Sequence, residues 1–494
     1  MNDSAVGQQS VAPILSTSGS FGARFFGHLR DFQKSPWETL RRFNAECGGL
    51  GRVVFLGNSL LVVNTPELVG ELLVANAQSC RKSPIVRAAL FPLVGDGLFT
   101  SEEELWRRQR KLMAPLFHPS RVEAFADMMS RAASRAVETW RDGQEIDVMR
   151  ETTRIAMAVA GKSLFDIDTF DEADELGAAL TTALHWSAET ATSVALGLQF
   201  EAATQVRKLS AHMPGALREQ AVRAAESLTT PIRLPTRRNR VLAEAISIID
   251  RRVERMIAER RASRSTSEDL LTRLLDARDE GGGVAMTDRQ LRDEIVTLFV
   301  AGHETTANAL GWALYLLGRS PAPRARLFEE IGALRGEPAA LGDLARLPYT
   351  QQVFKESLRL YPPVPVYERQ VLEPFEIGGY HLARGEFATV FPWALHHRPE
   401  LYPDPETFDP DRFTAEAEEK RPRYTFVPFG AGPRVCIGNH FALLEGPLVL
   451  ATMLGRVELE ACDDKPVDMD PMAATLRPLG SIRMRVRRRD RRPS

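Results

Sequence analysis

The chain has 494 residues, of which 44% are hydrophobic, and this proportion is sufficient for a substantial buried core. Lysine and arginine number 63 and aspartate and glutamate 65, so the formal net charge is −2. A balance so close to neutral excludes the strongly basic surface typical of nucleic-acid-binding proteins, and we expect no nucleic-acid partner.

Four cysteines stand far apart in the chain: Cys47, Cys80, Cys436 and Cys462. They do not form a disulfide framework, which indicates a reducing compartment. Residues 1–20 are polar and small and lack the apolar region of a signal peptide, so we expect them to be disordered. No apolar run reaches the about 18 residues of a transmembrane helix, and we therefore expect a cytoplasmic monomer without a membrane anchor.

Two β-rich runs come first, Arg52–Phe55 and Leu60–Val63, and they predict a β-hairpin around the sequence LGNS. Thr65 followed by Pro66 predicts a helix start, with threonine as the N-cap and proline in the first turn. From there to Asp276 the pattern is mostly helical.

A long apolar helix is the next predicted element. The Gly281–Gly283 run breaks the preceding pattern, and Thr287 with Gln290 forms a capping box. The apolar stretch Arg292–Gly318 spans 27 residues, or about 40 Å of helix. Because it is apolar nearly all round, we expect it to cross the interior of the protein.

The remainder of the chain mixes short elements. A further helix ends at Pro362-Pro363, and the strand-like pieces FEIGGY, HLARG and FATVFP follow it. A proline-punctuated coil is predicted over Pro399–Gly432, the last apolar helix begins near Ile437, and weak strands finish the chain.

This order of elements indicates a mainly α protein with smaller β-sheets, in the α+β class. The sequence has neither an internal repeat nor a linker. We therefore expect one large domain over residues 21–487, between the disordered segment and a solvated basic tail over residues 488–494.

The stretch FGAGPRVCIG, Phe429–Gly438, carries the strongest chemical signal. Its glycines allow tight bending, and Cys436 stands where the final helix starts, so free backbone N–H groups and the helix dipole favour a thiolate. Arg434 adds a cation. Metal ligation is favoured over two alternatives that remain open: a structural cysteine in a turn, and a phosphate-binding glycine loop that here lacks its G-K-[ST] motif.

The chain resembles the cytochrome P450 family from about Ser35 to Arg487. Five residues match its haem-binding signature F-x-x-G-x-R-x-C-x-G: Phe429, Gly432, Arg434, Cys436 and Gly438. The resemblance implies the cytochrome P450 fold, with haem b (iron protoporphyrin IX) between the long central helix and the helix after the cysteine loop. It also implies Cys436 as the iron ligand.

The sequence AGHETT lies midway along the long helix. A zinc-protease motif H-E-x-x-H is excluded, because Ala307 occupies the second histidine position. The stretch resembles the family's oxygen-activation motif, which implies that Glu304 and Thr305 deliver protons to dioxygen and that Ala301 lies against the haem. The bland alternative is a threonine hydroxyl that bonds back to its own helix, and it is compatible with the first interpretation because such a bond often bends the helix. We interpret His303 as a satisfied helix histidine.

Arginine side chains form two further groups of matches. The resemblance implies that Trp106, Arg110, Arg369 and Arg434 hold the haem carboxylates, which suits the bidentate guanidinium. It implies a second, structural network of three residues on the proximal side of the haem: Glu356, Arg359 and Arg412.

The implied reaction is monooxygenation with electrons from NAD(P)H. Only 58 residues follow Cys436, so we expect separate redox partners, a ferredoxin or flavodoxin with a reductase. Arg107, Arg108 and Lys111 form either a docking patch for an acidic electron donor or an ordinary solvated helix face.

The family pattern also implies where the substrate binds. It assigns contacts to four largely apolar segments: Lys82–Leu98, Phe299–Ala301, Val364–Tyr367 and Ala473–Thr475. Val300, Val364, Val366 and Ala474 are the pocket residues expected within them, and Glu175–Pro231 is expected to form a mobile lid. A hydrophobic substrate is implied: a fatty acid, terpenoid, steroid or polyketide-like compound.

Two other functions remain as alternatives. One is a haem-thiolate peroxygenase, isomerase or dehydratase, and the other is a non-catalytic haem protein that binds a ligand. A peroxygenase, isomerase or dehydratase needs no acid–alcohol pair, so the presence of Glu304 and Thr305 favours a monooxygenase.

Overall fold

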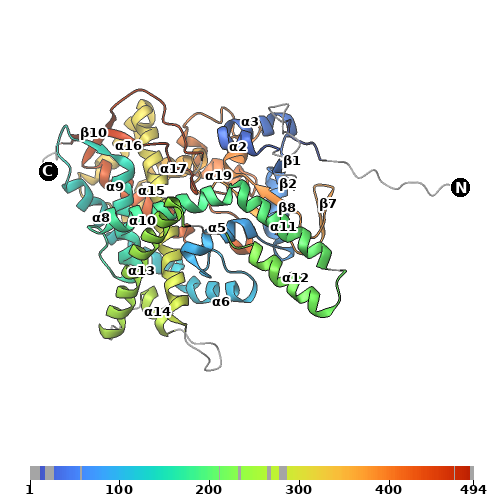
Figure 1. Ribbon diagram of the computed structural model, residues 1–494. Coiled ribbons are helices and arrows are strands. Elements are labelled where there is room, and N and C mark those ends of the chain that lie inside the picture. Colours follow the sequence, from blue (N-terminus) through green and yellow to red (C-terminus); the bar gives the residue numbers. More distant parts are fainter. Residues whose placement is uncertain are drawn as a thin grey trace.

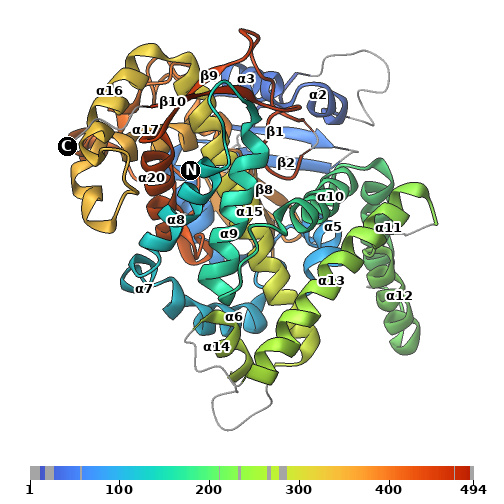
Figure 2. The same cartoon turned by 90° about the vertical axis from the view of Figure 1, so that its left-hand side faces the viewer.

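Helix α15 (Asp288–Arg319) runs through the middle of the protein (Figures 1 and 2). The computed structural model describes residues 12–16, 27–55, 58–210, 212–231, 235–263, 269–276, 286–471 and 473–489. The predicted capping box is present, since Thr287 Oγ1 accepts the Gln290 N–H at 3.2 Å and the Gln290 side chain accepts the Thr287 N–H at 3.0 Å. The prediction of an interior helix is confirmed, because most α15 side chains are buried.

Helices surround α15 on most sides (Figure 2). The other helices are α2 (Leu29–Lys34), α3 (Pro36–Cys47), α4 (Pro66–Gly70), α5 (Pro84–Val94), α6 (Glu103–Met113), α7 (Pro119–Glu123), α8 (Ala126–Glu138), α9 (Val148–Phe165), α10 (Ala173–Ala191), α11 (Val194–Ser210), α12 (Gly215–Leu228), α13 (Arg237–Ser263), α14 (Leu270–Asp276), α16 (Pro321–Ile331), α17 (Pro348–Leu360), α18 (Pro392–His396), α19 (Ala415–Lys420) and α20 (Asn439–Leu454). Short helical turns cover Glu71–Ala75, Ala77–Ser79, Ala114–Phe117, Gly332–Leu334, Leu341–Arg346, Pro410–Phe413 and Gly432–Arg434.

The strands form three small sheets. One has five strands in the order β1 (Leu50–Phe55), β2 (Asn58–Val63), β8 (Phe387–Val390), β5 (Tyr367–Val371) and β3 (Cys80–Lys82). The second has the order β4 (Glu145–Asp147), β10 (Arg483–Arg488) and β9 (Val457–Ala461), and the third pairs β6 (Phe375–Ile377) with β7 (Tyr380–Leu382). The predicted hairpin is confirmed, since β1 and β2 pair antiparallel with Leu50 opposite Val63. The mainly α fold with small sheets is thus confirmed.

The apolar core fixes α15 between neighbouring helices. Trp312 is fully buried, stacks on Tyr361 with ring centroids 3.9 Å apart, and donates its indole N–H to the Leu476 carbonyl at 3.0 Å. A Cβ on Gly311 would lie 2.3 Å from the Met149 sulfur, so this glycine permits the close approach of α9. These contacts leave α15 little freedom to shift along its axis.

The structure differs from the sequence predictions in three places. Residues 12–16, inside the segment predicted to be disordered, pack on the first sheet, where Leu15 is buried and donates its N–H to the Arg52 carbonyl at 3.1 Å. The predicted coil Pro399–Gly432 contains helical turns, among them α19, whose N-cap Thr414 accepts a backbone N–H. Arg488, assigned to the tail, pairs with Val457 in the second sheet. The remainder of the predicted N-terminal segment, the glycine run 281–283 and residues 490–494 lie outside the described residues.

Candidate active site

Cys436 lies in the loop that leads into α20, and two glycines determine the shape of this loop. Gly430 and Gly432 have φ values of 72° and 70°, which residues with a Cβ rarely adopt. A Cβ on Gly432 would also lie 2.0 Å from the Leu73 carbonyl oxygen. The Cys436 N–H donates to the Phe429 carbonyl at 2.9 Å and closes the turn. For steric reasons, the turn therefore requires glycine at position 432 of the signature.

The thiol of Cys436 is exposed by accessible surface, yet burial among protein groups raises its pKa. Cys436 is thus accessible and yet surrounded by protein groups. The Gly438 N–H and then the Arg110 guanidinium lower that pKa. α20 begins at Asn439, so the predicted start near Ile437 was two residues early. An N–H group and a cation thus support an anionic sulfur here.

One turn of α15 is open, although the turns on either side are buried. Ala301 is exposed and Thr305 is half-buried. The Thr305 hydroxyl donates to the Ala301 carbonyl at 2.6 Å, a bond of the kind that often bends a helix. Val300 on this turn and Ile437 beside the cysteine pack against the same apolar cluster. The open turn and the cysteine loop therefore border the same part of the interior.

Glu304 is buried and has a partner that the sequence analysis did not assign to it. The Thr475 hydroxyl donates to Glu304 Oε1 at 2.9 Å, and the Asn308 amide donates to that hydroxyl at 2.9 Å. Burial raises the pKa of Glu304, and Thr475 and then Arg477 lower it in part. Glu304 Oε2 has no hydrogen-bond partner among the described residues. Each member of the expected acid–alcohol pair thus has another hydrogen-bond partner: Thr305 bonds to its own helix, and Glu304 bonds to Thr475.

His303 is a buried helix histidine, but its hydrogen bonding is only half satisfied. Its Nδ1 lies 2.6 Å from the Phe299 carbonyl oxygen one turn earlier. Its Nε2 has no partner in the part of the chain that the structure describes. Burial lowers the pKa of His303 to about 4, so the ring is neutral near pH 7.

Several cations lie close together near the N-terminal end of α6. Arg434 stacks on Trp106, with the guanidinium carbon 4.1 Å from the ring centroid, and pairs with the carboxylate of Glu102. Burial and then Arg434 lower the pKa of Lys82 to about 7, and the same two causes lower the pKa of Arg369. The charge of Arg434 thus disfavours the charged forms of Lys82 and Arg369, and Glu102 opposes this effect in both. This excess of positive charge suits a ligand that brings carboxylates of its own.

Sequence reasoning did not predict the contacts of Lys82, Glu102 and Thr475, although Lys82 and Thr475 lie at the ends of segments assigned to the substrate pocket. Glu102 precedes Trp106 by four residues, a helical spacing that could have drawn attention to it. Lys82 is a lone lysine in a short strand, and Thr475 stands in a late turn, so the sequence offers no comparable signal for either.

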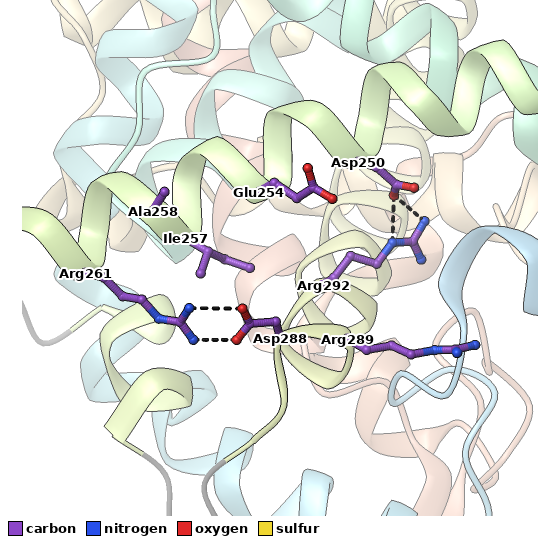
Figure 3. Close-up of a pocket in the computed structure, with 8 residues that line it drawn as sticks. All are labelled: Asp250, Glu254, Ile257, Ala258, Arg261, Asp288, Arg289 and Arg292. Atoms are coloured by element: carbon purple, nitrogen blue, oxygen red, sulfur yellow. Dashed lines mark hydrogen bonds and ion pairs between the residues drawn. The ribbon is translucent and has the colours of Figure 1, made fainter.

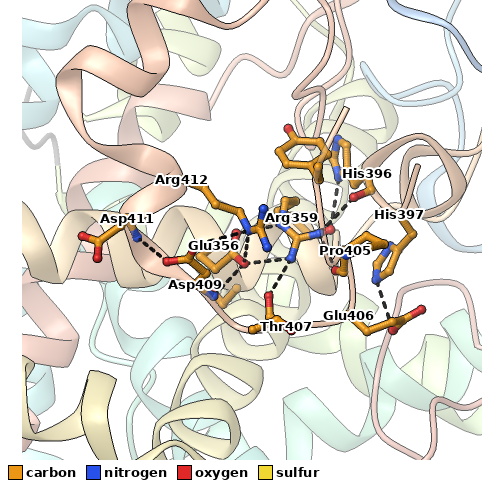
Figure 4. Close-up of polar contacts among 12 residues, drawn as sticks. Glu356, Arg359, His396, His397, Pro405, Glu406, Thr407, Asp409, Asp411 and Arg412 are labelled. Atoms are coloured by element: carbon orange, nitrogen blue, oxygen red, sulfur yellow. Dashed lines mark hydrogen bonds and ion pairs between the residues drawn. The ribbon is translucent and has the colours of Figure 1, made fainter. Parts of the chain in front are cut away.

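Glu356, Arg359 and Arg412 lie together in one network of polar contacts (Figure 4). Arg359 and Glu356 are fully buried and form two hydrogen bonds of 2.7 Å. Arg412 Nε lies 3.5 Å from Glu356, in an ion pair that is too long for a good hydrogen bond. Arg359 also donates to the carbonyls of His396 and Pro405 at 2.9 and 2.8 Å. The network therefore connects α17 to the coil that precedes the cysteine loop.

His396 extends this network to the cysteine loop itself. Its Nε2 accepts the backbone N–H of Val427 at 3.0 Å. The Tyr367 hydroxyl lies 3.1 Å from the Val427 carbonyl and 2.9 Å from the Pro428 carbonyl. The family pattern assigned the segment that ends at Tyr367 to the substrate pocket, but the Tyr367 hydroxyl points to the cysteine loop.

The predicted substrate residues are only partly in contact with one another. Val300 and Ala474 pack on the same apolar cluster. Val364 and Val366 are half-buried and precede β5.

A surface groove of about 490 Å³ lies between α13 and α15, away from these residues (Figure 3). Charged side chains line it, and two ion pairs cross it, Arg292 with Asp250 at 2.7 Å and Arg261 with Asp288 at 2.5 Å. A lining of paired charges does not suit an apolar substrate, and the groove shares no residue with the surroundings of Cys436.

The basic residues of α6 lie partly on the surface. Arg107 and Lys111 are exposed and one turn apart, whereas Arg108 is half-buried. Within the described residues no helix is long and apolar enough to cross a membrane.

Comparisons with known proteins identify the family. The cytochrome P450 family model matches residues 18–484. Cyclooctatin synthase of Streptomyces melanosporofaciens is 34% identical over 84% of both chains, and pentalenene oxygenase of Streptomyces avermitilis is 30% identical over 89% of this chain and 91% of its own. The crystal structure of a cytochrome P450DA heme domain superposes with a TM-score of 0.78, at 26% identity and 98% coverage of both chains. The chain belongs to the cytochrome P450 family and is an oxidoreductase, a cytochrome P450 monooxygenase.

The family implies a haem cofactor, and the residues present fit it. The accessible Cys436 suits an iron ligand, the small and exposed side chain of Ala301 suits close approach of a flat ring, and the cation cluster has an excess of positive charge for two carboxylates. The donor set of one thiolate and several guanidinium groups is therefore appropriate to haem.

Proposed function

We propose that this protein hydroxylates or epoxidises a hydrophobic small molecule, with Cys436 as the thiolate ligand of haem b. The observation that carries the proposal is an accessible cysteine whose thiolate form is favoured by the Gly438 N–H and by the Arg110 guanidinium. When bound, the haem supplies the oxidising chemistry, to which a thiolate ligand contributes electron density.

The residues of this chain hold the cofactor and supply protons. Trp106, Arg110, Arg369 and Arg434 would hold the haem carboxylates, with Glu102 keeping the Arg434 guanidinium stacked on Trp106. Thr305 presents a hydroxyl at the open turn of α15. Glu304, held by Thr475, stores a proton, because burial favours its neutral form.

We propose a terpenoid as the substrate class. The names of two relatives refer to terpenoids, cyclooctatin and pentalenene. Partly accessible aliphatic side chains at Val300, Val364, Val366 and Ala474 suit a hydrocarbon skeleton. Helices α10 to α12 fill most of the segment proposed as a lid, Glu175–Pro231.

Electrons would come from NAD(P)H through separate proteins, a ferredoxin or flavodoxin with its reductase. The exposed cations Arg107 and Lys111 lie on α6, the helix that also carries Trp106 and Arg110. An acidic donor that docks there would be close to the edge of the haem.

The test is the absorption spectrum of the reduced carbon monoxide complex. We expect the purified wild type to take up haem and give the thiolate-type Soret band. Cys436→Ser should lose that band, and Cys462→Ser, a change at another free cysteine, should keep it. The same spectrum in wild type and Cys436→Ser would contradict the proposal.

A further inference from the structure

The coil before Cys436 has few backbone anchors of its own. Pro428 has no N–H to donate, and Gly430 adopts a φ of 72° without the restriction of a side chain, so this part of the chain depends on contacts from elsewhere to hold its peptide groups. The Gly430 N–H donates to the Val427 carbonyl at 3.1 Å, and the Cys436 N–H donates to the Phe429 carbonyl at 2.9 Å. The second of these bonds sets the direction of the cysteine backbone, so the orientation of the neighbouring peptide groups matters.

Two side chains from other elements hold this coil from outside. His396 at the end of α18 accepts the Val427 N–H at 3.0 Å, and the Tyr367 hydroxyl reaches the carbonyls of Val427 and Pro428 at 3.1 and 2.9 Å. The phenol ring also packs against Gly430, whose Cβ, if present, would lie 3.6 Å from it. Val427 is thereby fixed at both its N–H and its carbonyl.

Strand β5 explains why Tyr367 can do this. Side chains alternate along a strand, so Tyr367 and Arg369 share one face, and Glu368 and Gln370 share the other. Arg369 lies beside Arg434 in the cation cluster, whereas Gln370 accepts hydrogen bonds from Arg81 of β3. The face of β5 that carries Arg369 thus faces the cysteine loop as well.

We infer that Tyr367 is a positioning residue for the iron ligand: its hydroxyl fixes the Val427–Pro428 backbone and thereby the turn that presents the Cys436 sulfur. This inference rests on the proposed function, because it takes Cys436 to be the ligand. It assigns Tyr367 to the loop behind the sulfur and not to the wall of the substrate pocket.

The experiment compares Tyr367→Phe with Tyr315→Phe, each as the haem-loaded protein. Tyr315 is a matched control, since it is a buried tyrosine whose hydroxyl accepts a backbone N–H, that of Val467, at 3.1 Å. Both variants lose one buried hydroxyl and its hydrogen bonding. The readouts are the rate at which the reduced carbon monoxide complex loses its thiolate-type band and the midpoint reduction potential of the haem.

We expect Tyr367→Phe to lose the band about five- to tenfold faster than wild type, the factor that corresponds to one buried hydrogen bond. Its reduction potential should shift, and Tyr315→Phe should match wild type in both measurements. A site-specific Tyr367→fluorotyrosine variant, which has a stronger donor and almost the same shape, should lose the band more slowly than wild type. If Tyr367→Phe takes up no haem, the fluorotyrosine variant still tests the inference.

Three results would overturn the inference. The two phenylalanine variants could behave alike, in which case Tyr367 contributes only to general packing. Tyr367→Phe could weaken binding of an apolar substrate probe while band and potential stay unchanged, which would assign Tyr367 to the substrate pocket. If the wild type itself lacks the thiolate-type band, the proposed function fails first, and the inference fails with it.

Discussion

At the scale of single residues, the two groups proposed to deliver protons are not equivalent. The Thr305 hydroxyl is at an open turn and bonds to a carbonyl that could exchange it for another partner. Glu304 is enclosed and depends on Thr475, which in turn accepts a bond from Asn308. In the proposed mechanism, Thr305 is therefore the accessible hydroxyl and Glu304 the buried acid.

Thr305→Ala should reduce the product formed per NAD(P)H consumed by about tenfold or more, because a positioned proton donor is lost. Thr475→Val should reduce it less, since Glu304 keeps its carboxyl but loses the bond that lowers its pKa. Product and NAD(P)H are measured together with surrogate redox partners. If Thr305→Ala forms product as fast as wild type and only peroxide, not NAD(P)H with redox partners, supports turnover, the peroxygenase alternative is favoured.

At the scale of elements, α15 also anchors the loop between α5 and α6. Asp293 accepts the Asp96 N–H and Glu294 accepts the Leu98 N–H, both at 3.0 Å. Lys82 donates to the carbonyls of Leu98, Phe99 and Ser101 from the opposite side. The loop is thus held between β3 and α15, and it leads directly into the helix that carries Trp106.

This anchoring predicts a pH-dependent stability. Burial raises the pKa of Glu294 to about 8, so the folded protein keeps a proton that the unfolded chain releases above its ordinary pKa of 4.5. The stability contribution of Glu294 therefore falls as pH rises between these values, by up to about 1.4 kcal/mol per pH unit. Lys82 does not oppose this between about pH 5 and 7, because with a folded pKa of about 7 it is protonated in both states below that pH.

Glu294→Gln should remove this dependence while keeping an acceptor for the Leu98 N–H. Urea unfolding at pH 5 and at pH 7 gives the comparison, and the variant should gain stability relative to wild type as the pH rises. The exposed Glu259→Gln on α13 is the control and should give no such gain. A constant difference between Glu294→Gln and wild type would contradict the prediction.

At the scale of the whole molecule, the network around Glu356 joins α17, α18 and the coil before the cysteine loop (Figure 4). Both Glu356 and Arg359 are fully buried, so removal of one charge leaves the other without compensation. By contrast, Lys355 of the same helix pairs with Glu418 of α19, and these side chains are 24% and 35% exposed. Breaking each pair in turn therefore compares the stability contribution of a buried ion pair with that of a partly exposed one.

Glu356→Gln should reduce the free energy of unfolding by about 3–5 kcal/mol, measured by urea unfolding. Glu418→Gln, which breaks the partly exposed pair, should cost about 1 kcal/mol or less. Equal losses of unfolding free energy in the two variants would show that the buried network stabilises the fold no more than the partly exposed pair does.

The sequence by itself determined the long buried helix, the hairpin and the cysteine loop, because each depends on neighbours within a few residues. The capping box at Thr287, the N-cap at Thr65 and the glycine demanded at position 432 are examples. It did not determine which distant groups meet. The bond from Thr475 to Glu304, the pairing of Glu102 with Arg434 and the orientation of Tyr367 join segments about 60 to more than 300 residues apart. Only the tertiary structure decided these contacts, since burial and partner choice depend on how the helices and sheets pack against one another.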